Sequence, residues 1–253
     1  MGIRIYLTGR ITVEANEELA VDERRFRGKQ GRLVFAYLVS ERNRSVPRDE
    51  LARLLWPDEL APTWELSLSA LMSRLRRLLS SEGLKIAGVS LYSRASQYEM
   101  HLPAGTWVDL ESCLTAIDLA EGALRTGEPQ RIIGPATVAV NISRRPFLPG
   151  IEGEWVDSQR RRLERVRLRG LDCLSKMWLA RGEADLAVET ATEAVEIDPY
   201  RESSHLLLMR AHVLGGNRAN AFYVYHRLRK LLDDELGAGP SPETEAMYRD
   251  LLE

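Results

Sequence analysis

The side chains whose types and spacing most clearly suggest a chemical role are three arginines that lie close together in the first third of the chain. Arg74, Arg76 and Arg77 follow Ser73 within a stretch of alternating apolar and polar residues. A guanidinium group stays charged, and its planar donors match phosphate oxygens and the guanine edge. On an exposed helix face these arginines would bind nucleic acid; an ordinary solvated helix face is the alternative interpretation.

The other reactive side chains form no recognisable catalytic or metal-binding pattern. His205 and His212 lie seven residues apart, too far for the i, i+4 pair of a helical metal site. The sequence contains no Cys-x-x-Cys, phosphate loop or nucleophile elbow. We therefore expect a protein that is not an enzyme and needs no metal or cofactor, with His205 packing between helices.

Two helices joined by a turn are predicted to position the arginines. The first runs from Ser45 to Trp56, where Pro57 ends it because the residue before a proline avoids α geometry. The second spans Trp64–Leu79, and its predicted core stripe is Leu68, Leu71, Met72, Leu75, Leu78 and Leu79. Its opposite face carries Leu66, Ser69, Ala70, Ser73, Arg76 and Arg77, with Arg74 on the flank. Such a pair can lay its second helix in a DNA major groove.

Short strands are predicted on both sides of these helices. Alternation at residues 3–7, 11–13 and 19–21 indicates a small antiparallel sheet, followed by a helix from Lys29 or Gly31 to about Asn43. Strand pieces at 84–86, 89–93 and 98–102 follow the arginines, with a polar turn at 94–97. Three helices and then a hairpin are the winged-helix order, which places Arg94 near the wing tip.

Composition and charge predict two domains in a cytoplasmic protein. The 253 residues carry a net charge of −2, of which residues 1–108 contribute +3 and residues 109–253 contribute −5. A mildly basic part joined to an acidic one fits a nucleic-acid reader attached to a protein-binding domain. Cys113 and Cys173 are the only cysteines, as suits a reducing cytoplasm, and no apolar run reaches the roughly 20 residues needed to span a bilayer.

The second half of the sequence predicts helices only. Helices are expected at 109–125, at about 129–141 with an interruption at Pro135, and at 155–179. Gly182, Ala187 and Ala191 recur 34 residues later as Gly216, Ala221 and Tyr225. A 34-residue period with small residues at helix crossings is typical of tetratricopeptide repeats.

Several motifs resemble the SARP-type antibiotic regulatory activators of bacteria. In the first domain they are Val46-Pro47-Arg48-Asp49-Glu50-Leu51-Ala52-Arg53-Leu54-Leu55-Trp56-Pro57 and Met72–Arg77, which look like an OmpR-like winged helix. In the second they are Pro146–Gly150, Trp155-Val156, Ile197–Glu202, Leu208–Ala211 and Leu236–Thr244, which resemble the bacterial transcriptional activation domain. The resemblance covers the whole chain and implies a winged-helix domain at 1–108 and a tetratricopeptide-like domain at 109–253.

The resemblance also implies functional residues and partners. The third helix would read direct repeats in double-stranded promoter DNA, and the loop before it would contact RNA polymerase. The expected DNA-binding residues are Lys29, Arg48, Ser67, Ser69, Ser73, Arg74, Arg76, Arg77 and Arg94. The expected polymerase-contact loop consists of Pro57, Asp58, Glu59 and Leu60. A homodimer is left open, and the residues identify no small-molecule effector.

The chain departs from the family pattern at the front of the third helix. Glu65 would repel phosphates, and Leu66 is apolar where the family usually carries groove-reading polar residues.

The fold predicted is mainly α with a small β component, a winged helix-turn-helix followed by all-α repeats. The function predicted is a sequence-specific transcriptional activator; the alternative is a protein–protein adaptor or signalling regulator whose degenerate winged helix does not bind DNA.

Overall fold

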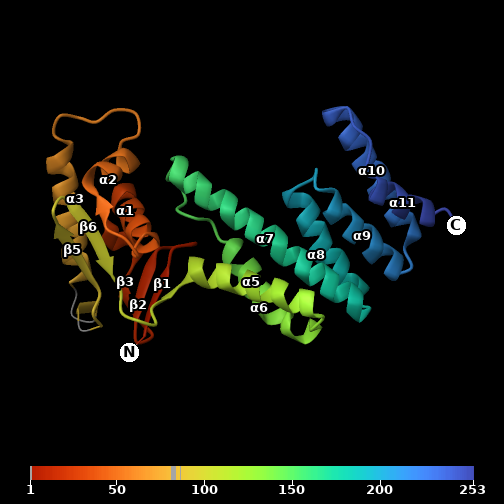
Figure 1. Cartoon of the computed structure of the whole chain (residues 1–253), viewed down its shortest axis with the longest axis horizontal. Helices are drawn as coiled ribbons and strands as arrows, with labels where there is room; N and C mark the ends of the chain where they lie inside the picture. The colour runs from red at the N-terminus through yellow and green to blue at the C-terminus, as the bar shows by residue number, and fades with distance from the viewer. Residues whose placement is uncertain (1, 81–83, 86) are drawn as a thin grey trace. The chain divides into compact units, whose positions relative to one another are not determined.

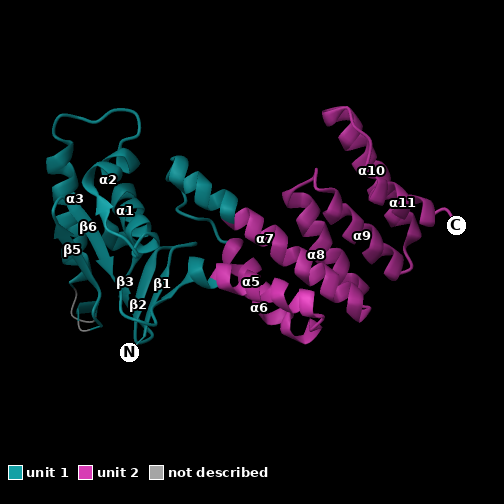
Figure 2. Ribbon diagram, in the orientation of Figure 1, with its two compact units in different colours: residues 1–112, 145–162 teal, residues 113–144, 163–253 magenta. Residues whose placement is uncertain are grey.

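A computed structural model of the protein describes residues 2–80, 84–85 and 87–253 (Figure 1). The chain divides into two compact units, one of residues 1–112 and 145–162 and the other of residues 113–144 and 163–253 (Figure 2). Two of the three divisions fall inside helices, one in α5 (Asp109–Thr126) and one in α7 (Glu154–Arg181), and the third follows residue 144.

The first unit opens with a four-stranded sheet. Its strands are β1 (Ile3–Tyr6), β2 (Thr12–Ala15), β3 (Glu18–Val21) and β7 (Trp107–Val108), in the order β3-β2-β1-β7. β1 is antiparallel to β2 and parallel to β7. Ile3 and Ile5 are 2% and 1% exposed whereas Arg4 between them is exposed, so one face of the sheet is buried. The predicted antiparallel strands are confirmed, and β7 is an addition.

Three helices and a second sheet complete the predicted winged helix. The helices are α1 (Lys29–Ser40), α2 (Arg48–Leu55) and α3 (Trp64–Leu79), preceded by a 3-10 turn η1 (Glu23–Phe26). The second sheet joins β4 (Val46–Pro47), β6 (Gln97–His101) and β5 (Ser90–Arg94). Figure 1 shows the long loop that connects α2 to α3. The expected end of the first helix of this pair before Pro57 is confirmed, since α2 stops at Leu55.

Two predicted boundaries around these helices are wrong. Helix α2 starts at Arg48 and not at Ser45, because Val46 pairs with Tyr98 in the second sheet and Pro47 is extended at ψ 150°. The strand piece expected at residues 84–86 is helical at Leu84 and Lys85, and Leu84 is fully buried. Ile86 lies outside the described residues.

The segment that follows the predicted first domain by more than thirty residues packs onto the N-terminal sheet and helices. Thr8 forms an isolated antiparallel β-bridge with Phe147, and the Gly9 N–H donates to the Pro146 carbonyl at 2.8 Å. Phe147 is 2% exposed, so the loop that carries it packs against the first unit. Trp155 lies edge-on to Tyr37 with ring centroids 5.0 Å apart. Residues 145–162 therefore share the core of the first unit.

Arg160, near the start of α7, binds the loop that precedes this helix. Its guanidinium donates to the carbonyls of Phe147, Leu148 and Ile151 at 3.1, 2.9 and 2.8 Å. Leu148 has a left-handed φ of 44°, so the loop curls its carbonyls toward one point. Five guanidinium donors suit such a convergence. Arg160 thus fixes the loop that closes the first unit.

The second unit consists of helices that stack in antiparallel pairs. Besides parts of α5 and α7 it contains η2 (Pro129–Arg131), α6 (Ile133–Ser143), α8 (Ala184–Ile197), α9 (Glu202–Leu214), α10 (Arg218–Leu236) and α11 (Pro242–Asp250). Gly182 and Gly216 both have positive φ in the turns, and Ala187 and Ala221 are fully buried, as the 34-residue period predicts. Pro135 does not interrupt its helix, since it lies in the first turn of α6 where no N–H partner is lost.

None of the helices in the described part of the chain has the length and apolar composition needed to cross a bilayer. The predicted packing of His205 is confirmed, because its ring is 2% exposed and Nε2 lies 2.9 Å from the Pro199 carbonyl oxygen. A carbonyl only accepts, so Nε2 carries the proton.

Burial lowers the pKa of His205 in the folded protein. The unfolded chain then binds a proton more readily than the folded one, so His205 stabilises the fold above about pH 6.5 and that stability is lost as pH falls below it. Replacing His205 by Gln keeps a donor toward Pro199 and removes the titration. We expect urea unfolding of wild type to lose more stability between pH 7.5 and 5.5 than His205→Gln does. Equal losses would contradict this assignment.

Candidate nucleic-acid interface

The outward face of α3 carries the residues that the sequence assigns to DNA. The predicted core stripe from Leu68 to Leu79 is buried throughout. The opposite face exposes Ser67, Ser73 and Arg77 together with Glu65 and Leu66. Leu66 is 72% exposed, the most exposed of the large apolar side chains in the described residues. The helix therefore presents a continuous surface of hydroxyl, apolar and guanidinium groups.

The three arginines of α3 do not all lie on the same side of the helix. Arg76 donates from Nε to the Leu91 carbonyl at 3.1 Å and lines a hollow beside β5. Arg74 and Arg77 line a different pocket on the other flank. No described carboxylate forms an ion pair with any of the three, and all three are exposed. Positive charge thus borders the outward face on both sides.

Arg48 and Ser69 are brought together, in a way that changes what they can do. The Arg48 guanidinium donates to the Ser69 hydroxyl at 2.8 Å and to the Glu65 carbonyl at 3.3 Å. The backbone N–H of Arg48 donates to the Ser96 carbonyl at 3.1 Å. Arg48 thereby joins the start of α2 to α3 and to the wing turn. It is a positioning residue for α3, and Ser69 is half-buried beside it.

A carboxylate network holds the start of α2 against α1. Arg44 donates to Glu50 at 2.5 Å, and the Tyr37 hydroxyl also donates to Glu50. The hydrogen bond from Arg44 lowers the pKa of Glu50, and burial together with Glu50 raises the pKa of Tyr37 to about 12. Both groups therefore keep their protonation states at neutral pH. The helix that supports α3 is fixed without using the arginines of α3.

The wing and the loop before α3 are also on the surface. Arg94 is exposed at the end of β5, next to a tight turn in which Ala95 and Ser96 have φ of 47° and 63°. Positive φ at both central positions is the hairpin geometry that follows strand twist. Pro57, Asp58, Glu59 and Leu60 are all exposed. Lys29 is exposed at the first position of α1, and no hydrogen bond or ion pair among the described residues links it to α3.

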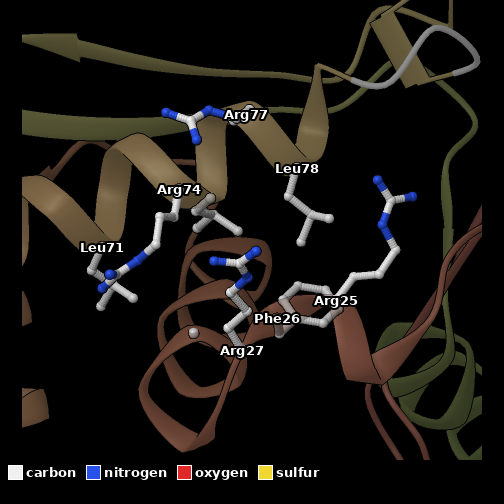
Figure 3. A pocket seen from close by; sticks show the side chains of 9 residues that line it. Arg25, Phe26, Arg27, Leu71, Arg74, Arg77 and Leu78 are labelled. Atoms are coloured by element: carbon white, nitrogen blue, oxygen red, sulfur yellow. The ribbon is translucent and has the colours of Figure 1, made fainter.

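Two arginines that the sequence analysis did not single out lie beside α3. Arg25 and Arg27, from η1 and the residue after it, line the same pocket of about 290 Å³ as Arg74 and Arg77 (Figure 3). Nothing local in the sequence brings residue 27 to residue 74. The available signal was the basic composition of residues 24–29, which only the fold turns into a site.

Comparison with known proteins gives the family. The model of the bacterial transcriptional activator domain matches residues 108–252, which is more than half of the chain. The chain belongs to the bacterial transcriptional activator domain family. Its relatives confirm the resemblance to SARP-type regulators, so it is a member of a family of transcriptional regulators.

Three relatives show the extent of the match. The transcriptional regulatory protein MoaR1 of Mycobacterium tuberculosis is 27% identical over 87% of this chain and 71% of its own length. The regulatory protein AfsR of Streptomyces coelicolor is 30% identical over 88% of this chain and 22% of its own length. The transcriptional regulator RedD of the same organism is 28% identical over 87% of this chain and 63% of its own length. The chain therefore spans only part of these proteins, and a small part of AfsR.

The fold has a solved counterpart. The structure of Mycobacterium tuberculosis EmbR in complex with a low-affinity phosphopeptide matches with a TM-score of 0.85 and 22% identity, covering 99% of this chain and 65% of that one. At this identity the match concerns the fold, and it agrees with the winged helix followed by helical repeats.

Proposed function

We propose that this protein is a bacterial transcriptional activator that reads promoter DNA with α3. The observation that carries the proposal is the outward face of α3, where Ser67, Ser73 and Arg77 are exposed and the guanidinium groups have no acidic partner among the described residues. Unpaired guanidinium groups on a helix that stands out from a buried core are available to phosphates and guanine edges. The family match covers residues 108–252 and does not include α3, but relatives that match 87–88% of the chain are regulatory proteins, which supports a regulatory role for the whole chain.

The exposed side chains of α3 favour contacts other than the paired hydrogen bonds that Asn and Gln amides make with adenine. Ser67 and Ser73 can donate to or accept from base edges, and Leu66 can contact a thymine methyl group. Glu65 is exposed next to them and opposes the approach of phosphates. Specificity would then come from a few hydroxyl and apolar contacts, while the arginines supply most of the affinity through the backbone.

The remaining parts have proposed roles in the same complex. Arg94 at the wing would contact the backbone on the side of α3 where Arg76 lies, and the exposed loop of Pro57, Asp58, Glu59 and Leu60 would meet RNA polymerase. Residues 1–108 would supply DNA reading and residues 109–253 protein contacts, including those of a homodimer. The protein would act in the bacterial cytoplasm.

The test begins with selection of bound duplexes from a random DNA pool, followed by titration of a selected duplex at two salt concentrations. Arg74→Ala and Arg76→Ala are compared with Arg4→Gln, a control that removes a charge from the outer face of the N-terminal sheet. We expect the two α3 variants to bind about tenfold more weakly and the control to bind as wild type does, since one phosphate contact contributes roughly one unit to the salt slope. Equal, salt-insensitive binding by all four proteins would refute DNA reading.

A second function, protein–protein docking through α3, is favoured by Leu66. A leucine that is 72% exposed on a helix face is the kind of side chain that buries in a partner's pocket. Recovery of a protein partner that Leu66→Ser releases, together with no enriched duplex, would favour docking over DNA reading.

A further inference from the structure

Four arginines surround one pocket at the side of α3. Arg74 and Arg77 extend from α3, and Arg25 and Arg27 extend from η1 and its end (Figure 3). The pocket measures about 290 Å³, and its remaining lining is mostly apolar, from Phe26, Leu71, Leu75 and Leu78. The site thus combines a basic rim with an apolar floor.

The positive charge at this rim is not compensated within the described residues. Across residues 2–80, 84–85 and 87–253 none of the four guanidinium groups is ion-paired, and Arg25 donates to the Ala20 carbonyl at 3.0 Å. The two acids of the same segment are engaged elsewhere. Asp22 accepts from the Arg24 N–H at 2.8 Å, and Glu23 pairs with Arg32 at 2.5 Å. Four neighbouring like charges repel one another, so an anion that enters the pocket is held strongly.

The loop that carries Arg27 is built to a fixed shape. Asp22 caps η1, and Arg27 adopts the left-handed region at φ 49° and ψ 57°, which is unfavourable for a side chain of this kind. Gly28 follows at φ 105°. Gly31 lies so close to the Phe26 carbonyl that an added Cβ would be 2.2 Å from its oxygen. These restraints hold Arg27 beside Arg74, and strained residues of this sort gather at functional sites.

We infer that this arginine pocket binds phosphates of the DNA backbone beside the groove that α3 enters. The inference rests on the proposed function, because Arg74 and Arg77 belong both to the exposed side of α3 and to the pocket. The guanidinium groups reach the pocket from two sides, α3 and the η1 segment, so they can bind consecutive phosphates along one DNA strand. Arginine is the side chain that binds phosphate bidentately. Arg76 and Arg94 on the other flank would hold the second strand.

The experiment measures binding of a selected duplex by Arg25→Gln/Arg27→Gln. Arg24→Gln is the matched control, because Arg24 is an exposed neighbour that does not line the pocket. We expect the double variant to bind at least about tenfold more weakly, with a salt slope less negative by about 2, since each phosphate contact contributes about 0.9. The control should stay within about twofold of wild type. Arg27→Gly is a second variant, because glycine removes the charge but adopts the left-handed backbone without strain. Weaker DNA binding by this variant therefore comes from the lost charge and not from misfolding of the loop.

A scan of the duplex then locates the contact. Each backbone phosphate in turn is replaced by an uncharged methylphosphonate, and affinity is measured for wild type, the double variant and the control. Phosphates whose neutralisation weakens wild type and control but not the double variant are those held by the pocket. If every phosphate matters equally to all three proteins, the inference is overturned.

The outcomes separate this inference from the proposed function. If wild type binds the duplex and the double variant binds equally well with the same slope, only the pocket assignment fails. If no protein binds any duplex, the proposed function fails, and the pocket assignment fails with it. ATP is titrated against wild type without DNA as a further arm. Binding of ATP that the double variant lacks, with DNA binding unchanged, would assign the pocket to a free phosphate compound and overturn the backbone assignment.

Discussion

Replacing Asp109 by Ala is expected to destabilise the first unit by about 3–5 kcal/mol, a fall in Tm on the order of 10 °C. The carboxylate is fully buried and accepts from the Leu7, Thr8 and Leu110 N–H groups and the Thr8 hydroxyl at 2.7–3.0 Å. The structure shows that it joins the end of β1 to the first residue of α5. Its loss leaves several buried donors without an acceptor.

Asp118→Ala is the matched control for this prediction. Asp118 lies on the same helix, its side chain is 74% exposed and it pairs with Arg169 at 3.2 Å. An exposed pair of this kind contributes at most about 1 kcal/mol. Asp109→Asn should also be strongly destabilising, because an amide NH₂ would face N–H donors. Thermal unfolding in which the Asp109 variants melt with the control would show that the carboxylate has no such role.

Replacing Gly31 by Ala is expected to cost at least about 2 kcal/mol of stability and to weaken DNA binding as well. The new Cβ would lie 2.2 Å from the Phe26 oxygen and 3.2 Å from its carbonyl carbon, so backbone must move. The element that moves is η1 or the start of α1, and η1 leads into Arg27. We therefore expect the arginine pocket to be distorted in the fraction of Gly31→Ala protein that still folds.

Gly134→Ala is the control for the same substitution. Gly134 lies in α6 with nothing near an added Cβ, so alanine there should be neutral or stabilising by up to about 1 kcal/mol. Thermal melting and duplex titration are measured on both variants. If Gly31→Ala melts and binds DNA as Gly134→Ala does, the close approach of η1 to α1 has no energetic importance.

Elements with a strong local pattern could be predicted from the sequence. The apolar stripe of α3 identifies its buried residues, because one helix face repeats every 3.6 residues. Trp56-Pro57 gives the end of α2 because proline restricts the residue before it. The 34-residue period gives the buried Ala187 and Ala221 of the repeats. The α3 part of the candidate site follows from the same pattern.

Features that depend on contacts distant in sequence could not be predicted. The packing of Phe147 on Thr8 and of Trp155 on Tyr37 joins segments more than a hundred residues apart. The pairing of Val46 with Tyr98, which removes Ser45 to Pro47 from α2, is decided by a strand fifty residues later. Arg25 and Arg27 line the same pocket as Arg74 only because η1 turns and packs closely against Gly31 in α1. No periodicity within a single element encodes these contacts.

The central claim is that α3 places unpaired arginines on double-stranded DNA. The most direct measurement is the affinity of the wild-type protein for a selected duplex over a range of salt concentrations. We expect a linear fall of log K with log salt, with a slope of about −4 or steeper, because Arg74, Arg76, Arg77 and Arg94 each release a counterion when they contact a phosphate, and Arg25 and Arg27 of the arginine pocket add to this release. A slope near zero, or no duplex enriched by selection, would contradict it.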